Sequence, residues 1–249
     1  MDTITAQKWL DRWDTQQERY VADREERFRV VIDVVRQATA GIAKPRIVDL
    51  GCGPGSLAER IADALPHAEI VGVDADPLLL ELANSAARAD VRFVRALLGD
   101  PAWADAVGMA GEWDAVVSST ALHWLAPTEL AQVFATAAGR LRPGGVLVNA
   151  DNMHLDGPLD AYAKVVREAR AIRVGVFDNE DWRAWWDAVL AEPGMGALAA
   201  AHSQVAISHD SSSGLTVGEY VSLLTGAGFA AAAGPVWQFG DDHVVVAVR

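Results

Sequence analysis

The sequence has a single cysteine, Cys52, among its 249 residues. One cysteine excludes an intrachain disulfide and a zinc site built on several thiolates, and it is typical of a protein in a reducing compartment. No apolar run approaches the roughly 20 residues that a helix needs to cross a bilayer. The first residues include acids and form no continuous apolar core, so they do not resemble a signal peptide. We therefore expect a cytoplasmic protein that does not contact a membrane.

Basic residues are also scarce. The sequence contains 21 lysines and arginines against 34 acidic residues, which gives a formal net charge of −13. Such a charge repels a phosphate backbone unless a basic patch is segregated, and no basic run is present. The six histidines and the acids show no paired spacing of the kind that metal ligands have. We expect a small-molecule substrate, no nucleic acid and no metal, and the sequence leaves open whether the chain forms a homodimer.

The sequence does contain a regular alternation of short apolar runs and helical patterns. A helix predicted over residues 15–41 comes first, with Phe28, Val31, Ile32 and Val35 on one face. Five predicted strands follow, each separated from the next by a helical pattern: 46–50, 69–74, 91–95, 113–119 and 146–150. Strands that are apolar throughout and joined by helical crossovers indicate a parallel sheet covered on both faces, as in a doubly wound α/β fold.

The alternation stops after the fifth strand. More than sixty residues separate this strand from a helix predicted over 217–229, whereas a crossover needs about a dozen. The intervening segment contains two helical patterns, 158–174 and 180–192, which we interpret as an inserted helical lid. Two short strands, 235–240 and 243–249, close the chain as an antiparallel hairpin. The predicted organisation is an N-terminal helical cover (1–44), an α/β core (45–150 and 217–249) and the lid (151–216).

A glycine-rich stretch, VDLGCGPG, lies between the first predicted strand and the helix that follows it. Glycines here let the main chain approach a ligand closely, and the helix N-terminus supplies free N–H donors. Gly51, Gly53 and Gly55 have the spacing GxGxG, with Asp49 two residues earlier, whereas a dinucleotide fingerprint is GxGxxG. The next strand ends in Asp74, 23 residues after Gly51, where a carboxylate can accept hydrogen bonds from both hydroxyls of a ribose. The pattern predicts a nucleotide-like cofactor.

These segments together resemble the class I S-adenosylmethionine-dependent methyltransferases, and the resemblance covers most of the chain. VDLGCGPGSLAERI is similar to their first motif, GVDAD to the acidic end of their second strand, and LRPGG to the turn before their fifth strand. The terminal hairpin is similar to their reversed seventh strand. TALHW, after the fourth strand, resembles the small-molecule branch that includes trans-aconitate methyltransferase and many natural-product enzymes. The resemblance implies a mostly parallel seven-stranded sheet with an antiparallel last strand, and S-adenosylmethionine as the cofactor.

The resemblance also implies a set of cofactor-binding residues. By analogy with the family, Asp49, Gly51 and Gly53 line the methionine side of the cofactor. Asp74 corresponds to the acid that holds the ribose. The other implied residues lie near the adenine, under the cofactor or on the N-terminal cover: Ala75, Leu97, Leu98, Ser118, Tyr20 and Arg27.

One position departs from the family pattern. Relatives often have an acid after the third strand that accepts from the adenine amino group, and Leu97 stands in its place. Either Asp100 takes this role, or Leu97 and Leu98 pack on the ring while backbone groups read it. On the N-terminal cover, Arg24 and Arg27 lie three residues apart. One of them clamps the methionine carboxylate, or both belong to a solvated run of charges.

Candidate acceptor residues follow the fourth and fifth strands, at the carboxyl edge where open α/β sheets bind ligands. His123 is a candidate general base, because an unperturbed histidine has a pKa of about 6.5 and can remove a proton near neutrality. The alternative is a histidine held by the core while Trp124 packs beneath the cofactor. His154 is a second candidate base. In the lid, Trp182 and Trp186 either wall an acceptor pocket or pack within the lid itself.

The expected reaction is methyl transfer to oxygen, nitrogen or carbon of a small-molecule acceptor, by in-line displacement in a site that excludes water. The product of the cofactor is then S-adenosylhomocysteine. Two alternatives stay open. One is a non-catalytic or atypical protein that binds S-adenosylmethionine, because a fold does not determine its chemistry. The other is an NAD(P)-dependent dehydrogenase, which the GxGxG spacing disfavours.

Overall fold

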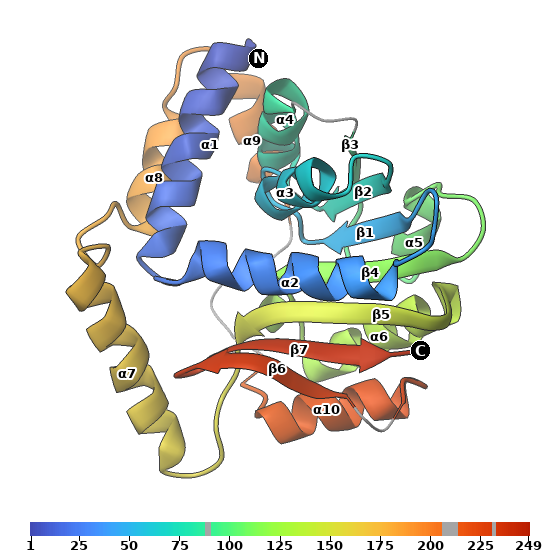
Figure 1. Ribbon diagram of the computed structural model, residues 1–249. Helices are drawn as coiled ribbons and strands as arrows, with labels where there is room; N and C mark the ends of the chain where they lie inside the picture. The colour runs from blue at the N-terminus through green and yellow to red at the C-terminus, as the bar shows by residue number, and fades with distance from the viewer. Residues whose placement is uncertain (88–90, 206–213, 231–232) are drawn as a thin grey trace.

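The computed structural model describes residues 1–87, 91–205, 214–230 and 233–249. Its centre is a seven-stranded sheet with the strand order β3-β2-β1-β4-β5-β7-β6 (Figure 1). The strands are β1 (Arg46–Leu50), β2 (Glu69–Asp74), β3 (Val91–Arg95), β4 (Trp113–Ser119), β5 (Leu141–Asn152), β6 (Gly234–Phe239) and β7 (Asp242–Val248). Strands β1 to β5 run parallel, and β7 runs antiparallel to both of its neighbours. This confirms the predicted doubly wound, mostly parallel sheet with an antiparallel last strand.

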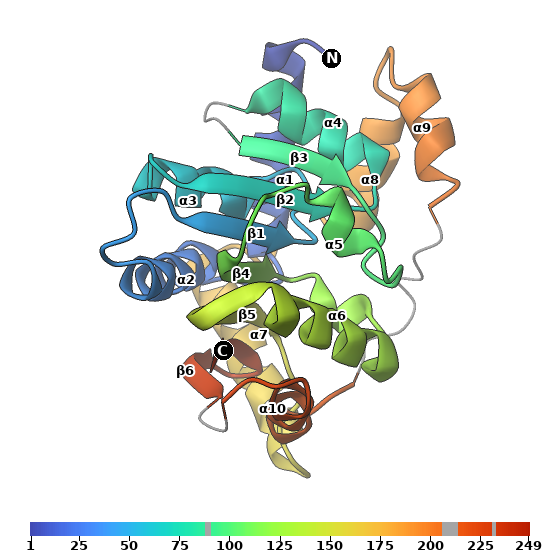
Figure 2. The same cartoon turned by 90° about the vertical axis from the view of Figure 1, so that its right-hand side faces the viewer.

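Helices cover both faces of the sheet (Figure 2). One layer consists of α2 (Arg24–Ala38), α3 (Ser56–Ala64) and α4 (Pro77–Ala86), and the other of α5 (Trp103–Ala106), α6 (Pro127–Arg140) and α10 (Val217–Gly226). Side chains of β1 alternate between the layers: Ile47 packs with α2 and α3, whereas Val48 and Leu50 pack against the opposite layer. Asp49, two residues after Ile47, therefore faces α2 and α3.

A third group of helices packs on α4. Helix α1 (Thr3–Glu18) contacts α4 and α8 (Trp182–Leu190), and α9 (Gly196–His202) contacts the same two helices (Figure 1). Their shared core, called the tryptophan cluster below, has the buried members Ala6, Trp9, Leu78, Leu79, Leu82, Ala86, Trp185, Trp186, Val189 and Met195. The rings of Trp9 and Trp185 meet edge to face, with centroids 6.0 Å apart. Three segments that are far apart in the sequence thus share one core.

Helix α7 (Leu159–Val174) lies apart from the tryptophan cluster (Figure 1). Two ion pairs hold it: Arg167 with Asp241 between β6 and β7 (2.6 Å), and Arg170 with Asp23 between α1 and α2 (2.7 Å). Both helices predicted for the inserted segment are confirmed as α7 and α8, while the domain boundaries stay a prediction. In the part of the chain described, no helix combines the length and the apolar character that crossing a membrane needs.

The sequence prediction was wrong at the N-terminus. The helix predicted over 15–41 is in fact two, since α1 ends at Glu18 and α2 begins at Arg24. The inward face of α1 includes Gln16 and Gln17, both buried, so the apolar periodicity that marks a helix becomes visible only in α2. The fifth strand is also longer than predicted, because residues 141–145 and 151–152 belong to it. Helix α9 was missed because its alanines give no apolar stripe.

Candidate functional site

The glycine loop after β1 is held by hydrogen bonds to β2 and packs closely against Ala121. The backbone N–H groups of Gly51 and Cys52 both donate to the carbonyl of Val73 at the end of β2 (2.8 and 3.0 Å). Gly51 and Gly55 have positive φ (64° and 89°), which glycine adopts at little cost. A Cβ at Gly51 would lie 2.3 Å from the Cβ of Ala121. Glycine is therefore required both by backbone conformation and by space.

Asp74 connects this loop to the next crossover. Its Oδ2 accepts from the backbone N–H of Gly53 and its Oδ1 from that of Asp76, each at 2.8 Å. Burial raises the pKa of Asp74 to about 6. A carboxylate has about four lone-pair positions, and these two bonds leave positions free for ligand hydroxyls. The geometry suits the ribose role that the sequence predicts for Asp74.

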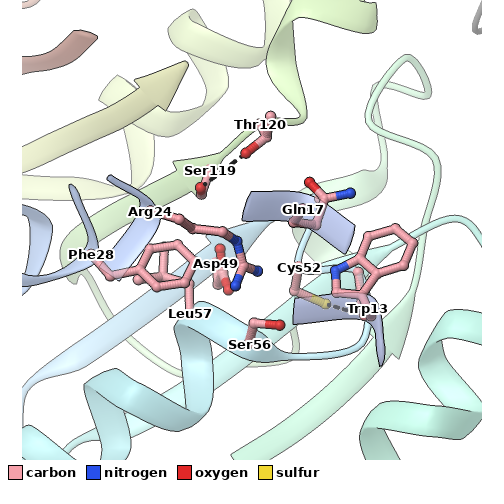
Figure 3. A pocket seen from close by; sticks show the side chains of 12 residues that line it. Trp13, Gln17, Arg24, Phe28, Asp49, Cys52, Ser56, Leu57, Ser119 and Thr120 are labelled. Carbon is pink, nitrogen blue, oxygen red and sulfur yellow. Dashed lines mark hydrogen bonds between the residues drawn. The ribbon is translucent and has the colours of Figure 1, made fainter. Parts of the chain in front are cut away.

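A pocket lies beside the glycine loop, at the carboxyl ends of β1 and β4 (Figure 3). Its volume is about 60 Å³, below the roughly 300–1,000 Å³ of a typical ligand site. Helix α1 contributes Trp13 and Gln17 to its wall. The other lining residues come from α2, β1, the loop, α3 and the end of β4: Arg24, Phe28, Asp49, Gly51, Cys52, Gly53, Ser56, Leu57, Ser119 and Thr120. Thus α1 narrows the pocket next to the loop.

Asp49 is the buried acid of this pocket. Its side chain is 1% exposed, and its Oδ2 has no hydrogen-bond partner among the described residues. Burial, together with the neighbouring Asp74 carboxylate, raises the pKa of Asp49 to about 8. An unpaired buried carboxyl group costs free energy, and a ligand cation would relieve that cost. Asp49 is therefore suited to face an ammonium or a sulfonium.

The two arginines of α2 have different partners. Arg24 lines the pocket and donates to Asp14 of α1 (2.9 Å). Arg27 is fully buried, and its guanidinium donates to Asp242 (2.6 Å) and to Ser119 and Thr120 (3.0 and 2.6 Å). The alternative of a solvated charge run is wrong, because Arg24 is only 5% exposed. Arg24, rather than Arg27, is placed to meet a ligand carboxylate.

The other predicted cofactor residues lie outside the pocket wall. Ser118 donates to the carbonyl of Leu50 (2.7 Å) and so connects β4 to β1. Tyr20 accepts through its hydroxyl from the backbone N–H of Trp182 (2.9 Å). On the adenine side, Ala75 accepts from Arg95 (3.1 Å). The remaining candidates there are Leu97, which is 43% exposed, Leu98, which is half-buried, and Asp100, which is exposed.

His123 is held by a buried carboxylate. Its Nδ1 lies 2.7 Å from Oδ1 of Asp151, and its backbone N–H donates to Oδ2 of the same residue (3.2 Å). Burial alone would raise the pKa of Asp151, but His123 and, more weakly, Arg27 hold it below its usual value. The ring also packs against Trp124, with centroids 4.4 Å apart. An ionised Asp151 fixes the proton on Nδ1 and leaves Nε2 as a proton acceptor.

The remaining candidates lie in two other places. His154 pairs with Asp160 (2.9 Å) where β5 leads into the inserted segment. Trp186 is 6% exposed and stacks on His202, whose Nδ1 meets Oδ2 of Asp76 at the start of α4. Trp182 packs edge-on against Trp186 at the rim of the tryptophan cluster. The sequence also contains His209, which lies outside the described residues.

Comparison with known proteins agrees with this geometry. Residues 47–145 match a family described as a methyltransferase domain. The chain is also similar to two proteins named trans-aconitate 2-methyltransferase. The one from Azoarcus sp. is 32% identical over 146 residues, which is 59% of this chain and 53% of the relative. The one from Methylobacterium radiotolerans is 33% identical over 135 residues, or 51% and 45%. Over residues 47–145 the chain is therefore similar to methyltransferase domains.

The matched part of the chain spans about half the length of these relatives. Solved structures of methyltransferases share its fold. One is magnesium protoporphyrin IX methyltransferase from Synechocystis with bound S-adenosylhomocysteine, with a TM-score of 0.59, 16% identity, and coverage of 96% of this chain and 94% of that one. Another is human N-acetylserotonin methyltransferase in complex with S-adenosylmethionine, with a TM-score of 0.52, 19% identity, and coverage of 94% and 56%. At such identities the likeness establishes the fold alone.

The fold predicted from the sequence is confirmed, and the predicted resemblance to methyltransferases is supported over residues 47–145. The roles of single residues stay predictions. Asp151 and Asp14 are among the residues that contact candidate groups directly and were not predicted. Asp151 directly follows the predicted fifth strand, so the rule that ligands bind at strand carboxyl ends contained a signal for it. Asp14 had no such signal, because its partner Arg24 is brought to it only by the packing of α1.

Proposed function

We propose that the protein transfers the methyl group of S-adenosylmethionine to oxygen, nitrogen or carbon of a small-molecule acceptor. The observation that carries the proposal is the contact of the glycine loop with Asp74, at the carboxyl ends of β1 and β2. Asp49 lies next to it, and its Oδ2 has no hydrogen-bond partner among the described residues. These groups fit an adenosyl sulfonium. Bare main chain allows close approach, free lone pairs of Asp74 suit ribose hydroxyls, and a buried acid suits a cation.

When bound, S-adenosylmethionine supplies an activated methyl group on a positively charged sulfur. The chain has to hold the acceptor in line with that methyl group and to exclude water, and such positioning accounts for about 7–11 kcal/mol of the barrier. Helix α1 already narrows the pocket, and α8 packs on α1. We assign the exclusion of water to α1 and to the helices of residues 151–216, which form the N-terminal cover and lid of this proposal.

His123 is the proton acceptor in this proposal. Its Nδ1 is held by Asp151, so Nε2 is free to take a proton from an acceptor hydroxyl. An acceptor that is already a carboxylate needs no base. Trans-aconitate, for which the relatives are named, carries carboxylates and would need no base. The His123–Asp151 pair instead supports an acceptor that must lose a proton. We therefore favour a hydroxyl acceptor, such as a phenol.

Calorimetry with S-adenosylhomocysteine tests the proposed cofactor site. Asp74→Ala removes charge-assisted hydrogen bonds worth about 1.5–3 kcal/mol each, so affinity should fall at least about tenfold. Asp33→Ala, which removes an exposed acid of α2 that pairs with Arg36, serves as the control and should bind like the wild type. Equal affinity of Asp74→Ala and the wild type would mean that the ribose binds elsewhere.

Two further measurements separate this function from its alternatives. A ligand at 100 times its dissociation constant stabilises a protein by about 2.7 kcal/mol, so thermal denaturation with S-adenosylhomocysteine and with NAD distinguishes a methyltransferase from a dehydrogenase. Formation of S-adenosylhomocysteine with a panel of acceptors distinguishes an enzyme from a non-catalytic binder. The net charge of −13 and the buried Cys52 support a cytoplasmic protein that acts on small molecules rather than on nucleic acid. Ultracentrifugation would decide between a monomer and a homodimer.

A further inference from the structure

The carboxylate of Asp14, on α1, lies at the first turn of α3. Its Oδ1 accepts from the Ser56 hydroxyl (2.6 Å) and from Arg24 (2.9 Å), and its Oδ2 accepts from Arg60 (3.0 Å). Ser56 is the first residue of α3 and directly follows the glycine loop. The start of a helix offers free N–H groups and a positive dipole end, and so attracts anions. Helix α1 thus contributes a negative charge beside the candidate cofactor site.

This anion is ionised and is held by two cations. Burial alone would raise the pKa of Asp14, but the guanidinium groups of Arg24 and Arg60 hold it below its usual value. Arg24 is 5% exposed, and Asp14 provides the one carboxylate within ion-pair distance of it among residues 1–87, 91–205, 214–230 and 233–249. A buried guanidinium without an anion is costly. If α1 moved away, Arg24 would therefore need another carboxylate.

The pocket beside Arg24 has the charges of an amino-acid binding site. Arg24, Ser56 and Asp49 all line this pocket (Figure 3). Oδ2 of Asp49 has no hydrogen-bond partner among the described residues. A group that carries both an ammonium and a carboxylate would pair with Asp49 and with Arg24. The volume of about 60 Å³ does not admit such a group while Trp13 and Gln17 of α1 narrow the pocket.

We propose that Asp14 occupies the place of the carboxylate at the amino-acid end of the cofactor, and that α1 must release Arg24 before this end can bind. This inference rests on the proposed function, because it takes S-adenosylmethionine or its product as the ligand. Asp14 and the ligand carboxylate compete for Arg24 and Ser56. Helix α1 is then a self-inhibitory cover, which is released by the ligand part that carries a carboxylate.

Asp14→Asn tests the competition, since it removes the charge and keeps the size of the side chain. We expect S-adenosylhomocysteine to bind this variant about tenfold more tightly than the wild type, because a charge-assisted contact no longer has to be broken. 5′-Methylthioadenosine has the same nucleoside and thioether but no amino-acid end, and its affinity should stay within about twofold. Asp11→Asn is the matched control: Asp11 lies on the same helix, is exposed and bonds to Gln7.

Several outcomes would overturn the inference. Unchanged or weaker binding of S-adenosylhomocysteine to Asp14→Asn would show that Asp14 supports the site rather than competing with the ligand. An equal gain for both ligands would show that α1 had merely loosened. In both cases the proposed function survives, whereas failure of the wild type to bind S-adenosylhomocysteine at all would overturn the function as well.

A second variant keeps the test decisive if Asp14→Asn does not fold. Arg24→Gln removes the group for which the two carboxylates compete. The wild type should prefer S-adenosylhomocysteine to 5′-methylthioadenosine, and in Arg24→Gln this preference should fall by about tenfold or more. An unchanged preference would show that Arg24 does not receive the ligand carboxylate, and the inference would be wrong.

Discussion

Asp49 is an acid in surroundings that oppose its ionisation. Burial and the nearby Asp74 raise the pKa of Asp49 to about 8, whereas the unfolded chain keeps the ordinary value near 4. Between these values the native state holds a proton that the unfolded state has lost, so the free energy of unfolding falls as the pH rises from about 4 to about 8. The buried carboxyl group of Asp49 thus lowers the stability of the native state near neutral pH, and the same group is placed to face a ligand cation.

The asparagine in Asp49→Asn cannot ionise, so this variant should not show the fall in unfolding free energy between about pH 4 and pH 8. We expect the variant to exceed the wild type in unfolding free energy at pH 8 by about 1.4 kcal/mol or more, and the gain to shrink toward zero near pH 4. Urea denaturation at several pH values measures the difference. A difference that is the same at every pH would show that Asp49 is not the titrating group.

The pair of His123 and Asp151 leads to a second prediction for single residues. Asp151→Asn can place an amide N–H against Nδ1 of His123, which favours the wrong tautomer for proton removal. With a hydroxyl acceptor, His123→Ala and Asp151→Asn should each lower kcat by about 10²-fold or more, and the loss in Asp151→Asn should change with pH. With a carboxylate acceptor, His123→Ala should retain its rate. Equal rates for wild type and His123→Ala with every acceptor would remove His123 from the mechanism.

The site residues that could be predicted from the sequence are those whose positions depend only on one strand and the turn that follows it. Asp49 and Asp74 stand at the ends of adjacent strands, so spacing along the chain was enough to place them side by side. Asp14 lies on α1 and Arg24 on α2. They meet only because the chain changes direction between the end of α1 at Glu18 and the start of α2. No local pattern encodes that turn, so their contact could not be predicted.

At the level of elements, one pair of side chains adds a polar contact to the packing of α9 on α4. Oδ1 of Asp76 accepts from the backbone N–H groups of Leu78 and Leu79 (2.8 and 3.2 Å) and so caps α4, while its Oδ2 meets His202 of α9. The backbone N–H of Asp76 donates to Asp74. The inserted segment is thereby connected to the candidate ribose acid.

Two variants separate the role of Asp76 as the cap of α4 from its contact with His202 of α9. His202→Ala removes the contact with α9 and leaves the cap of α4 intact, so amide hydrogen exchange should rise in α9 and stay unchanged in α4. Asp76→Ala removes both, so exchange should rise in both helices, and the lost cap should cost about 0.5–2 kcal/mol. Unchanged exchange of α9 in His202→Ala would mean that packing alone holds this helix.

The elements that were predicted correctly share a physical property. The five parallel strands are apolar on both faces because helices cover both, and such runs are visible in the sequence without knowledge of the fold. By contrast, α1 buries the polar residues Gln16 and Gln17 beside its apolar ones, and α9 packs on α4 and α8 without a fully buried residue of its own. Burial of this kind is decided by tertiary packing, which periodicity does not report.

At the scale of the whole molecule, α1 of the N-terminal cover and α8 of the inserted segment form one packing unit. Trp185 of α8 meets Trp9 and Trp13 of α1, with ring centroids 6.0 and 4.8 Å apart, and its indole N–H donates to the carbonyl of Trp9 (3.3 Å). Trp185 is fully buried. A movement of α1 that admits a ligand must therefore also repack α8, which couples the cover to the lid.

Trp185→Ala measures this coupling. Truncating a buried tryptophan leaves a cavity and costs about 3–5 kcal/mol. Because the cavity opens between α1 and α8, amide exchange should rise in both helices, while the parallel strands stay protected. Trp237→Ala, in the half-buried edge strand β6, should cost less and leave α1 unchanged. If exchange rose in α8 alone, α1 would be free to move without the inserted segment, and opening of the pocket would not involve the lid.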